Sequence, residues 1–359
     1  MFEGLSVAMV TPFRGGEVDR DATARLVDHL IDGGVHGLVV SGSTGEAATC
    51  TVEERRDLWR FVKERAKGRC WIVAGTGTNS TADSIVLTRM AEEIGMDGAM
   101  VVTPFYNKPT PKGQAAHFAA VASSTKLPVI LYNVPGRTGT NTTPEVLAMV
   151  HDLPNIKAVK EASGNLDQMA QVKTKTKLTL ISGDDSLTLP CVSVGGEGII
   201  SVVGHVVPRE MRQLIDHARA GRNAEALAMH QKLMPIFRAA FLESNPGPIK
   251  YLLAEMGLMA NELRLPLVPI EPATEKAVLE AARTVGLEVQ VAGLRAFCPA
   301  SQVALRPTSD LESFVGQRLA FRITRLDKGA RGTDVLLQFL IEAVVISLFG
   351  GGIGIALGY

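Results

Sequence analysis

Short apolar, β-branched runs recur along the first part of the chain and alternate with segments of helical spacing. Most of these runs are apolar at nearly every position, which is typical of strands that are buried on both faces of a parallel sheet. The eight runs are LSVAMVTPF, HGLVVSG, WIVAGTG, GAMVVTP, PVILYNV, IKAVKEAS, LTLISGD and GIISVVG. This pattern predicts a closed (βα)8 barrel, and a doubly wound open sheet is the structural alternative.

The segments between the runs carry signals for helix starts. Thr51, followed three residues later by Glu54, forms a capping-box pattern and predicts that a helix begins there. After the eighth run, only helical patterns follow as far as residue 285. We therefore expect an α/β fold, with a TIM barrel over residues 1–221 and a small C-terminal helical domain over residues 222–285.

The last part of the chain has a different character. Residues 287–328 alternate polar and apolar positions in the manner of strands, and residues 336–357 form an apolar stretch that only Gln338 and Glu342 interrupt. A stretch of this length can span a bilayer. The sequence thus predicts an atypical tail that includes a candidate transmembrane helix.

Polar side chains at the carboxyl ends of the predicted strands are the candidates for chemistry, because the active sites of (βα)8 barrels lie there. In the run IKAVKEAS, the two-residue period of a strand places Ile156, Ala158 and Lys160 on one face. A lysine in this position is either a solvated surface residue or an amine that apolar walls keep neutral for attack on a carbonyl. Its expected place at the barrel mouth favours the second interpretation.

Two further candidates belong to the preceding strand and its loop. Tyr132 has the same parity as Ile130, so its phenol is expected at the same rim, where it can transfer protons. The alternative for Tyr132 is a core tyrosine with a hydrogen-bonded hydroxyl. Arg137 follows in the loop YNVPGRTG, where proline and glycine indicate a turn. Its guanidinium can bind a substrate carboxylate, or it can simply be a surface arginine.

The loop GSTGE, residues 42–46, follows the second predicted strand. It offers backbone amides together with the hydroxyls of Ser43 and Thr44. Such a nest suits a small carboxylate or a phosphate, and the loop alone does not distinguish between them.

Composition and charge argue against several other classes of function. Lysines plus arginines equal the acidic residues at 37 each, so neither a nucleic-acid partner nor an acidic substrate is indicated. The seven histidines form no HxxxH pattern, which disfavours a metal site. The four cysteines form no CxxC pair, and no basic stretch precedes the first apolar run, so we expect a cytoplasmic protein without a signal peptide.

Three motifs together resemble the dihydrodipicolinate synthase and N-acetylneuraminate lyase superfamily: GSTGE, YNVPGRTG and the lysine in KEASGN. The resemblance runs from about Leu5 to about Val285. It implies that Lys160 forms a Schiff base with pyruvate and that no cofactor is needed. The arginine in YNVPGRTG is similar to that of the synthase branch, which condenses pyruvate with aspartate semialdehyde on the route to lysine and diaminopimelate. A pyruvate-dependent aldolase or lyase that acts on a sugar acid is the alternative within the superfamily.

The resemblance also implies roles for the other candidates. Tyr132, Ser43 and Tyr106 would form a hydroxyl relay, with Tyr106 contributed by the neighbouring subunit, which implies a homotetramer built from dimers. Thr44 would hold the carboxylate of pyruvate, and Arg137 would hold that of aspartate semialdehyde. The backbone positions that would line the site are Gly183 and Ile200.

Two departures from the superfamily pattern are visible. Ser43 stands where the synthases commonly have threonine, so the hydroxyl is retained but its rotamer is less restricted. The regulatory site of lysine-inhibited members uses a tyrosine and histidines. The corresponding residues here are Phe105, Val52 and Arg55, and Asn79 is retained. We expect weak or absent feedback inhibition by lysine.

The superfamily does not account for the tail. Residues 286–329 resemble part of an S1-type RNA-binding domain, and residues 330–359 resemble the end region of an ABC-type export permease. These resemblances raise the non-enzyme alternative of an RNA-binding or membrane-tethered fusion. RNA binding is disfavoured because an incomplete OB sheet leaves unpaired edges. A membrane anchor and a helix that packs on the enzyme remain open.

Overall fold

The computed structural model describes residues 1–285, 289–291 and 294–296. The chain divides into two compact units, Met1–Leu279 and Glu280–Tyr359. The first unit contains the whole barrel. The boundary predicted between the barrel and the helical domain, at residues 221 and 222, does not coincide with the division into these two units and stays a prediction.

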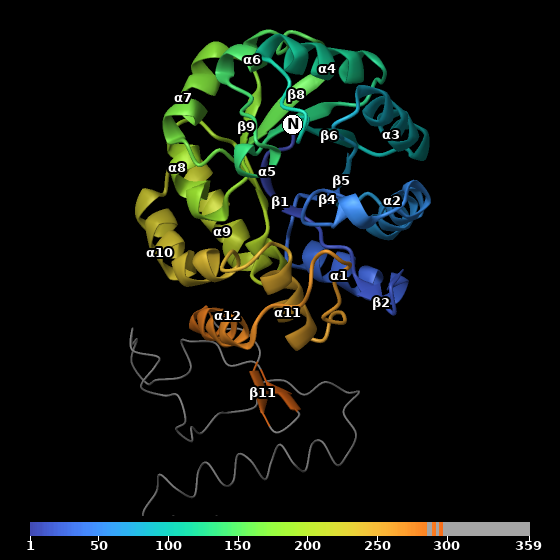
Figure 1. Cartoon of the computed structure of the whole chain (residues 1–359). Coiled ribbons are helices and arrows are strands. Elements are labelled where there is room, and N and C mark those ends of the chain that lie inside the picture. Colours follow the sequence, from blue (N-terminus) through green and yellow to red (C-terminus); the bar gives the residue numbers. More distant parts are fainter. Residues whose placement is uncertain (286–288, 292–293, 297–359) are drawn as a thin grey trace, which may run out of the picture. The chain divides into compact units, whose positions relative to one another are not determined.

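Eight parallel strands close into a barrel in the first unit (Figure 1). Strands that follow one another in the chain are neighbours, and β1 closes the barrel by pairing with both β4 and β10. The strands are β1 (Gly4–Ala8), β4 (Gly37–Val40), β5 (Trp71–Gly75), β6 (Gly98–Val102), β7 (Val129–Asn133), β8 (Ile156–Glu161), β9 (Thr179–Ser182) and β10 (Gly198–Ser201). The predicted closed barrel is confirmed, and the open sheet is excluded because no strand of this sheet has a free edge.

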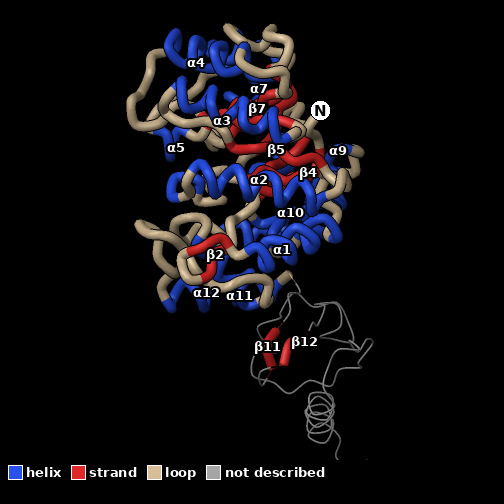
Figure 2. The backbone as a smooth tube through the Cα atoms, turned by 90° about the vertical axis from the view of Figure 1, so that its right-hand side faces the viewer, coloured by secondary structure: helices blue, strands red, loops and turns tan. Residues whose placement is uncertain are grey.

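Helices surround the barrel strands, as the tube in Figure 2 shows. The predicted capping box begins α2: the Thr51 hydroxyl accepts from the Glu54 amide at 3.1 Å, and the Glu54 carboxylate accepts from the Thr51 amide at 2.9 Å. The helices up to the last barrel unit are α1 (Arg20–Asp32), α2 (Val52–Ala66), α3 (Thr81–Ile94), α4 (Pro111–Ser123), α5 (Pro135–Thr138), α6 (Pro144–Ala148), α7 (Leu166–Lys175), α8 (Thr188–Ser193) and α9 (Pro208–Arg219).

The remaining described elements are short or lie after the barrel. The predicted helical patterns after the eighth strand correspond to α10 (Asn223–Ala239), α11 (Gly247–Glu255) and α12 (Pro272–Thr284). The short 3-10 helices are η1 (Ala47–Thr49), η2 (Asp185–Leu187) and η3 (Val203–His205). Two antiparallel hairpins are formed by β2 (Phe13–Arg14) with β3 (Glu17–Val18) and by β11 (Val289–Val291) with β12 (Leu294–Ala296).

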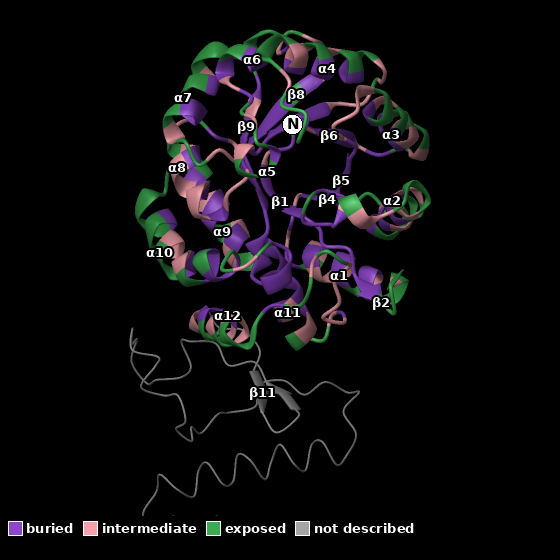
Figure 3. Ribbon diagram, in the orientation of Figure 1, coloured by how far each residue is buried: buried purple, intermediate pink, exposed green. Residues whose placement is uncertain are grey.

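The interior of the barrel is filled by one apolar side chain from each strand. These side chains belong to one buried cluster, and Figure 3 shows the barrel strands as mostly buried. In strand order they are Ala8, Val39, Val73, Met100, Ile130, Ala158, Ile181 and Ile200. A packed interior of this kind closes the barrel to water, so polar side chains on the inward face can reach solvent or ligand only at its ends.

The strand β8 departs from regular alternation at its start. Its register against β7 shifts between the first and second residue pairs, which leaves Lys157 as an extra residue. Ile156 packs with Val159 in the cluster between strands and helices, whereas Ala158 faces the interior. The prediction that Ile156 shares the face of Lys160 is therefore wrong, because the bulge reverses the alternation once. From Ala158 onward the alternation is as predicted.

Most of the tail lies outside the described residues. This applies to the S1-like segment beyond the β11–β12 hairpin and to the hydrophobic segment of residues 336–357. Within the described ranges, no helix combines the length and the apolar character needed to cross a membrane.

Candidate active site

Lys160 lies at the carboxyl end of β8 and on the face that lines the barrel interior. It follows Ala158 by two residues, so strand alternation turns both side chains to the same side. Only 4% of Lys160 is exposed. No carboxylate in the described part of the chain forms an ion pair with its ammonium nitrogen. The positive form of this lysine is therefore buried without a carboxylate in direct contact.

Burial lowers the pKa of Lys160 from 10.5 to about 8. The charges of Asp184 and Asp185 oppose this shift, and Arg137 reinforces it. At a pKa of about 8, roughly one tenth of the amine is neutral at pH 7, compared with roughly one part in 3,000 for an unshifted lysine. Lys160 thus presents a much larger fraction of the free amine that attacks carbonyl carbon.

Tyr132 is the neighbour of Lys160 across the pair of strands β7 and β8. The two residues are in register, and Nζ of Lys160 lies 4.3 Å from the centroid of the Tyr132 ring. Burial raises the pKa of the phenol to about 12, while the charge of Arg137 and a hydrogen bond with Ser43 act in the opposite direction. The phenol is therefore protonated at neutral pH, next to the amine, and linked to the hydroxyl predicted as its relay partner.

The loop 42–46 leads from β4 to η1 and folds back on itself. The amides of Gly45 and Glu46 donate to carbonyls of the same loop at 3.0 and 3.1 Å. The amides of Ser43 and Thr44, by contrast, donate to no atom in the part of the chain that the structure describes. Two consecutive free N–H groups are the elements of a nest for a small anion.

Asn245, which the sequence did not single out, joins two of the predicted residues. Its side-chain nitrogen donates to the Thr44 hydroxyl at 2.8 Å, and its backbone carbonyl accepts from the Arg137 guanidinium at 3.3 Å. Because Thr44 Oγ1 accepts from Asn245, its own proton remains available for a ligand. Asn245 is 5% exposed, and its Oδ1 has no partner among the described residues. It therefore retains an unused acceptor beside Thr44 and Arg137.

No local signal could have found Asn245, because it lies 201 residues from Thr44 in the sequence.

Arg137 lies on a short helix, where the sequence predicted a turn. Residues 135–138 form the short helix α5, which starts with Pro135 and ends at Gly139 with a φ of +70°. Proline suits the first helical position and glycine the left-handed cap, so both residues of the motif have a conformational role.

Gly183 lies beside Lys160, and Ile200 belongs to the apolar interior of the barrel. A Cβ atom at Gly183 would lie 3.0 Å from Cε of Lys160 and 2.6 Å from Cβ of Ala162, so only glycine leaves this space to the lysine side chain. Ile200 is fully buried in the same interior cluster as Tyr132.

Two acidic residues after β9 complete the surroundings of Lys160, and neither was predicted from the sequence. Burial raises the pKa of Asp184 to about 6, and the charge of Lys160 opposes this rise. Asp185 is buried, and its carboxylate accepts from the hydroxyl of Ser201 and from the amide of Val202, the latter at 3.0 Å. The available signal was the pair of aspartates directly after a barrel strand.

Tyr106 is not engaged in the site of its own chain. It is 88% exposed, has a φ of +72°, and its hydroxyl makes no hydrogen bond within the described ranges. The described residues likewise contain no group of three or more histidine, cysteine or acidic side chains that could hold a metal ion.

The fold and the site define a class of protein. A buried lysine of lowered pKa, next to a protonated tyrosine and an anion nest at the end of a (βα)8 barrel, is the arrangement of an aldolase-type enzyme that acts through a lysine Schiff base.

Comparisons with known proteins agree with this class. The model of the dihydrodipicolinate synthetase family matches residues 1–284. The chain is 45% identical over 289 residues to the 4-hydroxy-tetrahydrodipicolinate synthase of Nitratidesulfovibrio vulgaris (strain DP4). The aligned region covers 80% of this chain and 99% of that protein. The crystal structure of dihydrodipicolinate synthase from Aquifex aeolicus superposes with a TM-score of 0.78 at 39% identity, covering 79% of this chain and 97% of the other.

A second solved structure, DHDPS from Cyanidioschyzon merolae with lysine bound, has a TM-score of 0.77 at 41% identity and covers 79% of this chain and 98% of that one. The chain belongs to the dihydrodipicolinate synthetase family, and it is an enzyme, a lyase of the aldolase type. The names of these relatives favour the synthase reading over a sugar-acid lyase and over a non-enzymatic fusion.

Proposed function

We propose that this enzyme is a 4-hydroxy-tetrahydrodipicolinate synthase, which condenses pyruvate with L-aspartate 4-semialdehyde in the biosynthesis of lysine and diaminopimelate. The observation that carries the proposal is the buried Lys160, whose pKa is lowered to about 8, in register with Tyr132. The names of relatives that are 45% identical support it. The test is borohydride reduction in the presence of pyruvate, followed by mass spectrometry of the peptide that contains Lys160.

We propose the following sequence of steps for these groups. The neutral Lys160 amine attacks the keto carbon of pyruvate, and loss of water from the resulting carbinolamine gives the imine. Tyr132 supplies a proton to the departing hydroxyl and recovers it through Ser43. Loss of a methyl proton then gives an enamine, whose carbon bonds to the aldehyde carbon of the second substrate. The amine of that substrate finally attacks the imine carbon, which closes the ring and releases Lys160. No separate cofactor takes part in this sequence.

The carboxylates of the two substrates need separate binding sites in this reaction. We assign the carboxylate of pyruvate to the amides of Ser43 and Thr44 and to the Thr44 hydroxyl, which Asn245 leaves free to donate. We assign the carboxylate of aspartate semialdehyde to the Arg137 guanidinium, because a planar fork of donors matches the two oxygens of a carboxylate.

Tyr132→Phe should lower kcat about 100- to 10,000-fold, because the ring that packs against Lys160 remains while the proton donor is lost. The melting temperature should change little, since only one hydroxyl is removed. The measurement is the steady-state rate with both substrates, combined with the rate of borohydride trapping by pyruvate alone. A folded variant that retains a third or more of the parent rate would remove Tyr132 from the mechanism.

The proposed assembly is a homotetramer built from dimers, in which Tyr106 enters the site of the partner subunit. The high exposure of Tyr106 and of Phe105 next to it, at 88% and 38%, supports an interface at this loop. A cytoplasmic location is also proposed, and the free thiols of Cys50, Cys70 and Cys191 suit a reducing compartment.

L-lysine at millimolar concentration should leave the rate of this enzyme almost unchanged. Phe105 offers no phenol and Val52 no imidazole, and the Arg55 guanidinium would repel the ammonium groups of lysine. The measurement is the initial rate at subsaturating pyruvate with increasing lysine, and the relative from Cyanidioschyzon merolae serves as the lysine-binding control. Inhibition at sub-millimolar lysine would show that other residues bind the effector.

A further inference from the structure

A second lysine is even more completely buried than Lys160, and it has a different environment. Lys250 on α11 and Glu46 at the end of the loop 42–46 form an ion pair in which both side chains are 0% exposed. Nζ of Lys250 also donates to the carbonyl of Glu262 at 2.8 Å and lies 4.3 Å from the centroid of the Phe13 ring. The amine is thus enclosed by a carboxylate, a carbonyl and a ring. Burial lowers the pKa of Lys250, and the carboxylate of Glu46 acts against this shift by stabilising the ammonium form.

Glu46 adopts a backbone conformation that its own side chain does not favour. Its φ and ψ are +52° and 37°, in the left-handed region, where residues other than glycine carry a steric cost. The carboxylate offsets this cost through long-range contacts: besides the pair with Lys250, it accepts from the amide of Arg264 at 3.0 Å. The conformation of the last residue of the loop is therefore set by residues more than 200 positions away.

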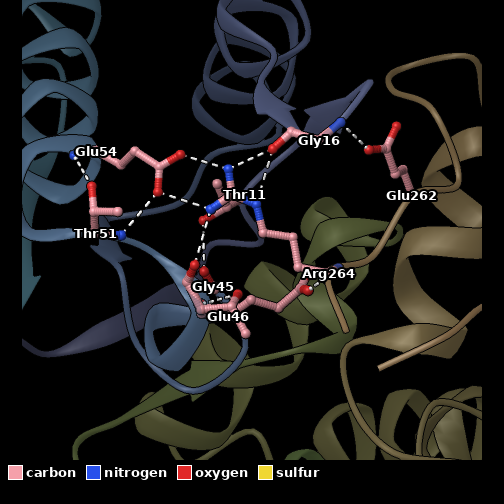
Figure 4. A network of polar contacts seen from close by, with 9 residues as sticks. Thr11, Gly16, Gly45, Glu46, Thr51, Glu54, Glu262 and Arg264 are labelled. Atoms are coloured by element: carbon pink, nitrogen blue, oxygen red, sulfur yellow. Dashed lines mark hydrogen bonds and ion pairs between the residues drawn. The ribbon is translucent and has the colours of Figure 1, made fainter. Parts of the chain in front are cut away.

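Arg264 ties the same point to the start of α2. Figure 4 shows it reaching Glu54 of the capping box, and its guanidinium also donates to the carbonyls of Gly16 and Thr49. Its guanidinium carbon lies 4.3 Å from the centroid of the Phe13 ring, so Phe13 packs against both cations. Glu46 is thus surrounded by a set of mutually bonded groups rather than by one contact.

The residue before Glu46 is clamped from the other side. The Thr11 hydroxyl donates to the carbonyl of Gly45 at 2.7 Å, and both groups are buried. A Cβ atom at Gly45 would lie 2.9 Å from the carbonyl oxygen of Met9, so the loop packs closely against the segment that follows β1. These two anchors immediately follow the free amides of Ser43 and Thr44.

We propose that the Glu46–Lys250 ion pair and the Thr11 hydroxyl are positioning groups of the active site, which hold the loop 42–46 so that the amides of Ser43 and Thr44 receive the carboxylate of the keto acid. The proposal rests on the proposed function, in which this loop binds pyruvate. None of the three side chains touches the substrate. They act through the backbone of a loop whose amides must stay in place when the anion binds, and the helix α11 thereby becomes part of the pyruvate site.

The test is a kinetic comparison of Lys250→Met with the parent enzyme, with borohydride trapping of pyruvate on the parent as the first step. Lys250→Met should raise KM for pyruvate about 10- to 100-fold, because small displacements of positioned groups have effects of this size. KM for aspartate semialdehyde should change less than about threefold. A parent enzyme that forms no adduct would refute the proposed function itself. A parent that forms the adduct and a folded variant with unchanged pyruvate KM would refute only the positioning role.

A matched control is available at the opposite end of the barrel. Lys63 pairs with Asp97 at 2.6 Å, and Asp97 also accepts from the amide of Ile72 at 2.7 Å near the start of β5. Like Glu46, Asp97 thus accepts a hydrogen bond from a backbone amide, but this pair lies away from the active site. Lys63→Met should lower the melting temperature and leave both KM values unchanged.

The double variant Glu46→Gln/Lys250→Met separates positioning from stability. Removing both charges relieves the burial of an unpaired carboxylate, so the melting temperature should recover relative to Lys250→Met. The pyruvate KM should remain raised, because the neutral pair no longer holds the loop. Recovery of both quantities would refute the proposal. If neither variant folds, Thr11→Val provides the test, because it removes only the hydrogen bond to Gly45. A folded Thr11→Val variant with the same pyruvate KM as the parent enzyme would refute the proposal that these groups position the loop.

Discussion

Lys160→Met should abolish the borohydride adduct with pyruvate and lower the rate of the complete reaction at least about 1,000-fold, the scale seen when a covalent nucleophile is removed. Methionine has a similar length and no ionisable group, so it fits the buried position. The melting temperature should equal or exceed that of the parent, because an ionisable amine is costly to bury. A loss of activity without a loss of stability would therefore be a chemical effect.

Lys157→Met is the matched control for this substitution. Lys157 lies on the same strand three residues earlier, but the bulge in β8 leaves it exposed. The control should retain the parent rate and the adduct. An adduct that persists in Lys160→Met and disappears in Lys157→Met would contradict the assignment of the nucleophile.

The pH dependence of trapping gives an independent check on Lys160. The pKa of its amine is lowered to about 8, so the neutral form is scarce below that pH and predominant above it. The trapping rate of the parent should rise about tenfold per pH unit well below pH 8 and level off above it. A rate that keeps rising toward pH 10 would indicate an unshifted lysine.

Arg137→Ala should lower kcat/KM for aspartate semialdehyde about 100-fold, which corresponds to ~3 kcal/mol for a charge-assisted pair. Arg137→Lys should recover only part of this loss, because an ammonium cannot form the planar fork. Pyruvate trapping should persist in both variants at a similar final extent, since the loop 42–46 holds the other carboxylate. The measurement is the steady-state rate with each substrate varied in turn.

The control for this substitution is Arg89→Ala, an exposed arginine on α3 at the outside of the barrel, which should behave as the parent. The same assay addresses the sugar-acid alternative. If Arg137→Ala turned over aspartate semialdehyde normally, or if the parent preferred a sugar aldehyde, the second substrate would have to be reassigned.

Local patterns in the sequence determined much of the fold. The apolar runs predicted all eight barrel strands, because a strand covered on both faces must be apolar at almost every position. Thr51 and Glu54 predicted a helix start through bonds that span only three residues. Strand parity also turned Lys160 and Tyr132 toward one centre, and their identity as amine and phenol set the class of chemistry.

Only the tertiary structure decided the pKa of the lysine at that centre and the long-range contacts that hold the surrounding loop. The lowered pKa of Lys160 depends on its burial, and strand parity indicates a face but not its depth. Asn245 reaches Thr44 and Lys250 reaches Glu46 across about 200 residues, and no local periodicity encodes such pairs. The misplaced Ile156 has the same origin, since a bulge is a property of two paired strands. The sequence alone thus determined the barrel and the candidate reacting groups, while long-range packing decided their protonation and their support.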